Sequence, residues 1–389
     1  MLRSLYSGIS GLRSHQTMLD VTGNNIANVN TTAFKGSAVQ FQDTLSQLTQ
    51  GAGGPQAQTG GTNPAQVGLG VQVAGISTNF TQGSAQATGR ATDMMIAGDG
   101  FFVTSIGGET RYTRAGAFDL DADGRLTAPD GSLVQGWNAV NGQIPTGGGI
   151  GNIQLPLKGV SPASATTAAT VGGNLPADAA NGTVLVRDVP VYGADGKPGT
   201  LTLTFTKAGN DWAVSGTDGA TTQTATLTFT NGVQTGGTLP AIGGITVDLS
   251  GVSGFATLST VAIEGQNGRQ AGTLESFTLS KDGTLVGLFS NGQKQPIARV
   301  ALATFANPGG LEKTGSSGYR ATVNSGAATY GVPGGDGLGV LAGGQLEMSN
   351  VDLSQEFTNL IVAQRGFQAN ARIITTSDEV LQELTNLKR

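Results

Sequence analysis

Residues 350–387, NVDLSQEFTNLIVAQRGFQANARIITTSDEVLQELTNL, carry the pattern that decides the fold of this chain. An apolar side chain occupies every seventh position over five heptads: Leu353, Leu360, Phe367, Ile374 and Leu381. Phe357 flanks this stripe. A seven-residue repeat predicts a helix that packs against another helix. At 1.5 Å per residue the helix would be roughly 55 Å long. The string Ser349-x-x-Asp352 is a capping-box signal for its start.

The N-terminal segment has the same periodicity. Leu5, Leu12, Leu19 and Ile26 are seven residues apart, and Ile9 lies on the same helical face. An asparagine-rich run follows, and because asparagine favours caps and turns, we expect the helix to end near residue 28. The two ends therefore predict helices over 1–28 and 350–387 that lie antiparallel and form a coiled-coil-like stalk.

The sequence between the ends is typical of a β protein. It is rich in glycine, with 63 in the 389-residue chain, and charged residues make up 12 %, about half the usual share. Val67, Leu69, Val71 and Val73 alternate with small or polar residues, as in a half-buried strand. We therefore predict a mainly β fold with long terminal α-helices.

Changes in composition predict the domain boundaries. Residues 44–89 contain no Asp, Glu, Lys or Arg, and we interpret 31–66 as an extended linker. Hairpin-rich sequence before and after a Thr/Ala/Gly-rich stretch indicates a discontinuous domain that carries an insertion. The predicted domains are a terminal helical inner domain (1–30 and 350–389), a discontinuous middle β domain (67–145 and 263–349) and an inserted outer β domain (146–262).

The composition excludes several classes of function. The chain has no cysteine and one histidine, which removes disulfides, thiolate chemistry and Cys/His zinc sites. Scarce general acids and bases argue against an enzyme, and a net charge of −5 argues against a nucleic-acid surface. The chain has no apolar run of about 18 residues and no apolar signal-peptide core, so we expect neither membrane insertion nor a cleaved signal peptide. We expect no cofactor and no metal.

One loop has the spacing of a calcium site. Asp119, Asp121, Asp123 and Gly124 match an EF-hand template, with Asp130 where glutamate is usual. The flanking sequence is typical of strands, not helices. We therefore predict a hairpin in which Asp123-Gly124 and Asp130-Gly131 form turns.

Residues 19–35, LDVTGNNIANVNTTAFK, closely resemble the N-terminal signature of the bacterial flagellar rod and hook protein family. The residues that carry this motif are Asn24, Asn25, Ile26, Ala27, Asn28, Asn30, Thr31, Phe34 and Lys35. Ala33 stands where many members have glycine. Residues 362–371, VAQRGFQANA, resemble the matching C-terminal motif, and 96–102 and 307–311 resemble core segments of the family. We recognise no motif in 146–262.

The resemblance implies a structural subunit of the bacterial flagellum that assembles with copies of itself into a homopolymer. The paired terminal helices would form an inner tube around an export channel. It implies an extracellular location in the basal body and hook, after export by the flagellar type III apparatus. The implied partners are the rod, the hook cap, the hook–filament junction proteins and the export apparatus. The residues expected to pack the helices and drive polymerisation are Leu5, Ile9, Leu12, Leu19, Ile26, Leu353, Phe357, Leu360, Phe367, Ile374 and Leu381.

The length of the insertion separates the members of this family. A large outer domain favours a subunit of the curved, flexible tube that transmits torque from the rod to the filament. The alternatives are a subunit of the straight distal rod and, less well supported, a cell-surface β adhesin, which has no reason to carry heptads at both ends.

Overall fold

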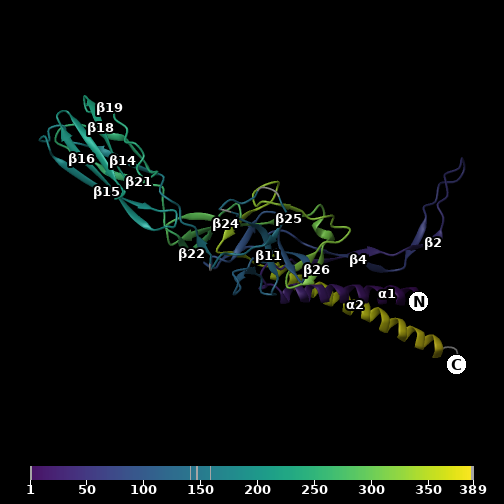
Figure 1. Ribbon diagram of the computed structural model, residues 1–389. Coiled ribbons are helices and arrows are strands. Elements are labelled where there is room, and N and C mark those ends of the chain that lie inside the picture. The colour runs from purple at the N-terminus through teal and green to yellow at the C-terminus, as the bar shows by residue number, and fades with distance from the viewer. Residues whose placement is uncertain (1, 141, 146–147, 158, 387–389) are drawn as a thin grey trace. The chain divides into compact units, whose positions relative to one another are not determined.

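The computed structural model describes residues 2–140, 142–145, 148–157 and 159–386 (Figure 1). The chain forms two compact units. Unit 1 comprises Met1–Leu155, Thr278–Val286 and Pro296–Arg389, and unit 2 comprises Pro156–Phe277 and Gly287–Gln295. Three strands are divided between the units: β22 (Gly272–Leu279), β23 (Thr284–Phe289) and β24 (Lys294–Val300).

Unit 1 contains both long helices, α1 (Leu2–Ala27) and α2 (Leu353–Asn386), which lie side by side and antiparallel (Figure 1). The residue that caps α2 is Asp352, whose Oδ1 accepts hydrogen bonds from the backbone N–H of Ser354 at 2.8 Å and of Gln355 at 3.3 Å. The predicted capping role of Ser349 is therefore wrong. The predicted outer ends of the helices, Met1 and Leu387, lie outside the described residues.

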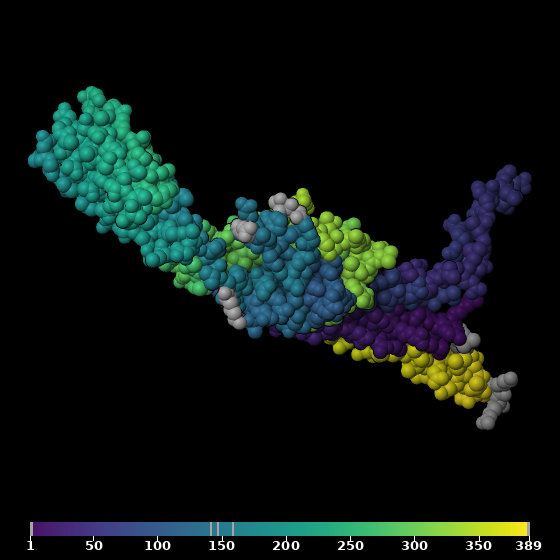
Figure 2. Space-filling model, viewed as in Figure 1, coloured from purple at the N-terminus to yellow at the C-terminus, as the bar shows by residue number. Residues whose placement is uncertain are grey.

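A two-stranded antiparallel ribbon follows α1. Strand β1 (Ser37–Asp43) pairs with β4 (Val71–Thr78), and further out β2 (Ser46–Gln50) pairs with β3 (Ala65–Gly68). We predicted a linker over much of this segment. The alternation of Val67, Leu69, Val71 and Val73 predicted one half-buried strand, which the structure divides between β3 and β4, with Val67 and Leu69 exposed. Strands β1 and β2 lie within the predicted linker, and β2 forms through backbone pairing without an apolar pattern. The outer part, residues 44–70, is called the arm below. Its base contacts α1, where Gly70 lies against Ser10, and its far end protrudes from the rest of unit 1 (Figure 2).

The remainder of unit 1 is a β domain. Its main sheet has the strand order β24-β11-β7-β8-β27-β26, and edge-to-face contacts among Phe80, Phe101, Phe305, Tyr112 and Tyr319 fill part of its core. Its strands are β5 (Ala85–Ala87), β6 (Met94–Ala97), β7 (Phe101–Ile106), β8 (Glu109–Thr113), β9 (Asp119–Leu120), β10 (Leu126–Thr127), β11 (Leu133–Asn138), β12 (Gly151–Asn152), β25 (Leu302–Thr304), β26 (Glu312–Gly315), β27 (Gly318–Arg320), β28 (Thr329–Gly331), β29 (Val340–Gly343) and β30 (Gln345–Glu347).

Unit 2 is a β sandwich around the fully buried Trp212. A five-stranded sheet in sequential order, β15 to β19, and a three-stranded sheet, β20-β14-β21, share one core. In β16 Leu201, Leu203 and Phe205 are buried and alternate with threonines, as their spacing predicts. The strands are β13 (Val160–Ser161), β14 (Ala168–Asn174), β15 (Val184–Tyr192), β16 (Pro198–Ala208), β17 (Asp211–Thr217), β18 (Thr222–Thr230), β19 (Val233–Gly236), β20 (Thr246–Ser253), β21 (Ala262–Gln266) and β22 (Gly272–Leu279).

The boundaries of this unit differ from the predicted insertion, 146–262. Strand β21 pairs with β14, and Ile263 packs against the core of unit 2, so a boundary at 262 cuts through a strand pair. The sequence AIEGQ of β21 carries no compositional signal that assigns it to one domain or the other. The inserted outer domain stays a prediction, and its proposed bounds, 146–262, differ from those of unit 2.

We expect a fragment of residues 156–277 to unfold in one cooperative transition, followed by the fluorescence of Trp212, its single tryptophan. A fragment of residues 146–262 lacks Ile263 and leaves β14 paired with β20 but without β21, its partner on the other side. Its unfolding free energy should be lower by at least about 1 kcal/mol, because an apolar side chain loses its burial. Equal stability of the two fragments would show that β21 is not an integral strand of unit 2.

Candidate functional site

The two terminal helices meet through small residues. A Cβ atom placed on Gly11 would lie 2.6 Å from Oδ1 of Asn370, and one placed on Gly366 would lie 2.5 Å from the ring of His15. Ser14 of α1 and Ala363 of α2 are also buried. The helix backbones approach closely at these positions, so the spacing of the pair is set by the absence of side chains rather than by interlocking leucines.

The predicted heptad residues flank these small residues. Ile374 lies against Gly8, with its Cγ1 3.6 Å from the position of a glycine Cβ. Half-buried heptad residues are Leu5, Ile9, Leu12, Leu19, Ile26, Leu360, Phe367 and Ile374, and exposed ones are Leu353, Phe357 and Leu381. The seven-residue repeat thus identified the helices but not the residues of closest packing. Their role in assembly remains a prediction.

Helix α2 has an apolar face that the described part of the chain leaves uncovered. Phe357 exposes 52 % of its surface and Ile361 49 %. Leu353 shares this face, since it precedes Phe357 by four residues as Phe357 precedes Ile361. Exposed apolar side chains on other sides of α2 are Val362, Ile373, Val380, Leu381 and Leu384. In Figure 2 the helix (yellow) protrudes beyond the start of α1 (purple). So many exposed large apolar side chains on one helix are typical of an interaction surface.

The substitutions Gly366→Ala and Gly23→Ala should have opposite effects on the helix pair. Each adds a good helix former, worth about 1 kcal/mol, but nothing lies within 4 Å of a Cβ on Gly23. We expect Gly23→Ala to raise the unfolding free energy by about 1 kcal/mol. Gly366→Ala should lower it by about 1 kcal/mol, because the clash with His15 outweighs the gain in propensity.

Urea unfolding followed by far-ultraviolet circular dichroism measures both effects. In a His15→Ala background the Gly366→Ala substitution should become stabilising, which makes the pair a double-mutant cycle. Destabilisation that persists in that background would rule out the His15 contact as its cause.

A buried ion pair lies where the helices join the β domain. Lys35 Nζ is 2.6 Å from Glu347 Oε1, and both side chains are fully buried. The lysine also donates to Thr81 O at 2.7 Å, and the backbone N–H of Gly83 donates to the same carboxylate oxygen. Arg114 Nη1 lies 3.6 Å from Glu347 Oε2. Burial lowers the pKa of Lys35, although the hydrogen bond and charge of Glu347 act to raise it.

This pair connects the two ends of the chain. Lys35 follows α1 and Glu347 precedes α2, and they are 312 residues apart in sequence. Removal of one partner from such a buried pair typically costs about 3–5 kcal/mol, because the other charge is left buried and unpaired. From the sequence, Lys35 was identified only as part of a family motif, and nothing predicted that it pairs with Glu347.

The other motif residues lie around this junction. Asn28 Nδ2 donates to Asn24 O at 2.9 Å at the end of α1, the local role predicted for the asparagine run. Asn25 is buried and reaches Ser37 instead. Ile26, Thr31 and Phe34 are half-buried, and Ala27 and Asn30 are exposed.

Ala33 adopts a backbone conformation that alanine rarely takes. Its φ is 56°, its side chain is fully buried, and its N–H donates to Glu347 O at 2.8 Å. A left-handed conformation costs an L-residue roughly 1–2 kcal/mol, whereas glycine adopts it freely. This strain explains physically why glycine suits this position in proteins with the same motif.

We expect Ala33→Gly to raise the unfolding free energy by about 1 kcal/mol, since it removes this strain. The matched control is Ala27→Gly in the last residue of α1, which should lower the unfolding free energy by up to about 1 kcal/mol. Chemical denaturation of the two variants measures both. A loss of stability in Ala33→Gly would contradict the strain at this position.

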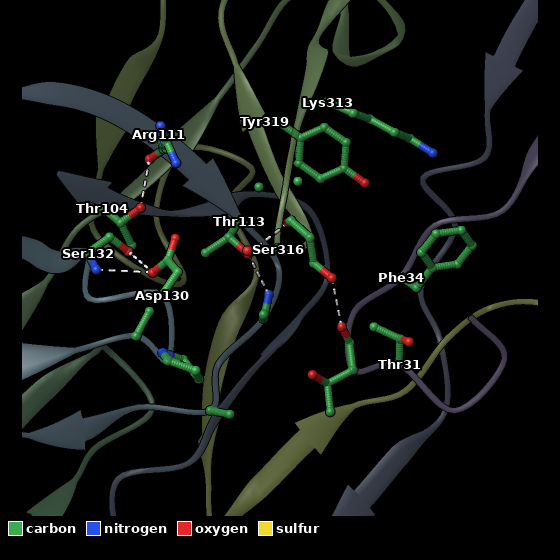
Figure 3. Close-up of a pocket in the computed structure, with 18 of the residues that line it drawn as sticks. Thr31, Phe34, Thr104, Arg111, Thr113, Asp130, Ser132, Lys313, Ser316 and Tyr319 are labelled. Atoms are coloured by element: carbon green, nitrogen blue, oxygen red, sulfur yellow. Dashed lines mark hydrogen bonds between the residues drawn. The ribbon is translucent and has the colours of Figure 1, made fainter. Parts of the chain in front are cut away.

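A cavity of about 510 Å³ borders the junction (Figure 3). Thr31, Phe34 and Tyr319 line it, together with Lys313, whose Nζ lies over the Phe34 ring and donates to Lys35 O and to Ser37 Oγ. Its single lining carboxylate, Asp130, accepts hydrogen bonds from both the backbone N–H and the hydroxyl of Ser132. The described lining residues thus offer hydroxyl groups, the cations Arg111 and Lys313, and one carboxylate that is already bonded within its own turn.

The loop with calcium-like spacing forms the predicted hairpin. Asp121 Oδ1 accepts from the backbone N–H of Asp123 and of Arg125, and its Oδ2 pairs with Arg125 Nε at 2.7 Å. Gly124 has φ 77°, as its turn requires. Asp119 is paired with Arg90. Within the described residues no group of three His, Asp or Glu side chains is placed to hold a metal ion.

Three family models match segments of this chain. The flagella basal body rod protein model matches residues 5–35, the flagellar hook protein FlgE/F/G D1 domain matches 95–173, and the flagellar basal body rod FlgEFG protein C-terminal model matches 342–387. The flagellar hook protein FlgE of Borreliella burgdorferi is 39 % identical over 442 residues, covering all of both chains. The chain belongs to the flagellar hook and rod protein family.

Other relatives match over their full length. The flagellar hook protein FlgE of Treponema pallidum is 38 % identical over 463 residues, and the flagellar basal-body rod protein FlgG of Bacillus subtilis is 36 % identical over 390 residues. In both comparisons all of both chains is covered. The family is structural and its members are not enzymes. Neither helix of the described chain carries an apolar stretch long enough to cross a bilayer.

Proposed function

We propose that this protein is the subunit of a flagellar hook, a curved tube formed by many copies that transmits torque from the rod to the filament. The observation that carries the proposal is the uncovered apolar face of α2. Apolar side chains that stay exposed in one copy are stabilised when other copies cover them. A contact of this kind that does not close on itself generates an open helical polymer.

Unit 2 favours a hook over a rod in this proposal. The sandwich has its own core, and most of it lies between the D1-domain match, which ends within unit 2 at residue 173, and the C-terminal match, which begins at residue 342. The second candidate is a subunit of the straight distal rod, which the full-length similarity to a rod protein supports. Electron microscopy of assembled protein separates the two, since a hook subunit gives curved tubes and a rod subunit gives straight ones.

The proposal extends to location and partners. The protein would act outside the cell, after export through the flagellum's own apparatus and without cleavage of a signal peptide. It would contact the rod at one end of the tube and the hook cap, later the hook–filament junction proteins, at the other. The lack of cysteine is compatible with passage through a narrow channel as an unfolded chain, because no disulfide has to be broken.

We expect Phe357→Asp and Ile361→Asp to abolish tube formation without unfolding the single chain. Both side chains are about half exposed in one copy, so a carboxylate stays hydrated there, whereas in a subunit contact it would be buried without a partner. Tube formation is measured by sedimentation and electron microscopy, and folding by the melting temperature.

The matched control is Thr358→Asp, which places the same charge on the neighbouring exposed position of α2. It should assemble more readily than the other two variants. Normal tubes from both Phe357→Asp and Ile361→Asp would refute a role for this face in assembly.

A further inference from the structure

Five asparagines of this chain are followed directly by glycine: Asn141, Asn181, Asn231, Asn267 and Asn291. The backbone nitrogen after an asparagine can attack the side-chain amide, and glycine permits this reaction best because it has no side chain to block the approach. This chemistry makes asparagine a labile residue in proteins. Asn141 lies outside the described residues, so the structure describes four of these sites.

Two of the four amides are held by hydrogen bonds. Asn267 Oδ1 accepts from the N–H of Thr167 at 2.9 Å and of Ala168 at 3.0 Å. Asn291 Nδ2 donates to Gln270 O at 3.0 Å. The glycine that follows each of them also donates its N–H, one to a glutamine side chain and the other to a backbone carbonyl. Both reacting groups are therefore restrained at these two sites.

The third site, Asn181, is restrained although it is exposed. Its Oδ1 accepts from the N–H of Gly209 at 2.9 Å, and the N–H of Gly182 donates to Lys207 O at 3.0 Å. Asn267 is exposed as well. Hydrogen bonding rather than exposure therefore separates the four sites.

Asn231 is the fourth site, and neither of its reacting groups is bonded. It forms a two-residue turn with Gly232 between Thr230 and Val233, which pair across β18 and β19 (Figure 1). The side chain of Asn231 is exposed, and within the described chain it makes no hydrogen bond. The N–H of Gly232 donates to no described group either.

The structure requires glycine at position 232, although this glycine is what makes the asparagine labile. Gly232 has φ 80° and Asn231 has φ 52°, as in the two-residue hairpin turns that favour the Asn-Gly sequence. A Cβ atom on Gly232 would also overlap the ring of Phe255. The pair of residues that suits this turn is therefore also the most reactive pair.

We propose that Asn231 is a site of spontaneous deamidation in the folded protein. When the end of the hairpin opens transiently, the nitrogen of Gly232 loses its proton and bonds to Cγ of Asn231. The Cγ–Nδ2 bond breaks, and Nδ2 takes up a proton and leaves as ammonia. Water then adds to a carbonyl of the cyclic imide and breaks one of its two C–N bonds, which yields aspartate or isoaspartate. The reaction consumes water and releases ammonia, without oxidation or reduction, and it needs no enzyme.

The product changes the charge of one edge of unit 2. Residues 219–247 contain no Asp, Glu, Lys or Arg, so the new carboxylate is the first charge in this part of the sequence. It lies next to β19, an edge strand of the five-stranded sheet, whose Val233 is 61 % exposed. Charge on an edge strand opposes pairing with the sheet of another molecule. Deamidation therefore converts a neutral edge into a negatively charged one.

The test incubates the folded full-length chain at mildly alkaline pH, which favours deprotonation of the attacking nitrogen, and follows each site by peptide mapping with mass spectrometry. We expect Asn231 to deamidate at least about tenfold faster than Asn181, Asn267 and Asn291, because those sites must first break the hydrogen bonds of their amides. Isoaspartate at Asn231 is detected with an isoaspartate-specific methyltransferase. Equal rates at the four sites, or no reaction at Asn231, would overturn the proposal.

The same chain unfolded in guanidinium chloride is the control for local sequence. All four asparagines precede glycine, so their rates should agree within a few fold once the fold is lost. An excess at Asn231 that persists in the unfolded chain would contradict selection of this site by the fold.

A pair of variants tests the change of charge. Glutamine forms the corresponding larger ring far more slowly, so Asn231→Gln should lose the main acidic form that isoelectric focusing detects in the aged parent. Asn181→Gln is the matched control and should accumulate this form as the parent does. An undiminished acidic form in Asn231→Gln would place the reactive asparagine elsewhere and refute the assignment.

Discussion

The ion pair between Lys35 and Glu347 is the constraint on which the organisation of unit 1 depends. It is buried and joins residues 312 positions apart, so it forms only when the two ends of the chain have come together. A buried charge without its partner is strongly unfavourable, which penalises any arrangement in which one helix is attached and the other is not. Two strained segments are held by hydrogen bonds beside this pair: the N–H of Ala33 donates to Glu347 O, and Ser317, in a left-handed turn, donates its hydroxyl to Thr32 O.

The helix pair shows how far a repeat in the sequence can be interpreted. The heptads of α1 and α2 correctly predicted two long helices and their antiparallel pairing, because apolar periodicity records which face is buried. They did not identify Gly11 and Gly366 as points of closest approach, since a glycine leaves no periodic apolar signal. These glycines matter because any side chain there would clash with the other helix: Gly11 faces Asn370, and Gly366 faces His15.

The junction was less predictable still. Asn25 belongs to a run of asparagines, and local propensity accounts for Asn28 but not for Asn25, whose partner is the backbone of Ser37. Lys35 gave no indication of Glu347, because ion pairs between distant residues depend on the completed fold. In the β regions, alternation identified strands such as β16 and part of β4. Strand β2 and the ends of unit 2 escaped detection because their pairing depends on backbone groups common to all residues.

The arm, residues 44–70, carries no ionisable side chain. Salt screens interactions between charges, and protonation changes only groups that titrate, so neither acts directly on the arm. Whatever the arm touches, it does so through hydrogen bonds, shape and apolar side chains such as Leu45 and Leu48. Contacts of this kind contain no charge for salt to screen and no group for acid to protonate, which suits the location outside the cell proposed above.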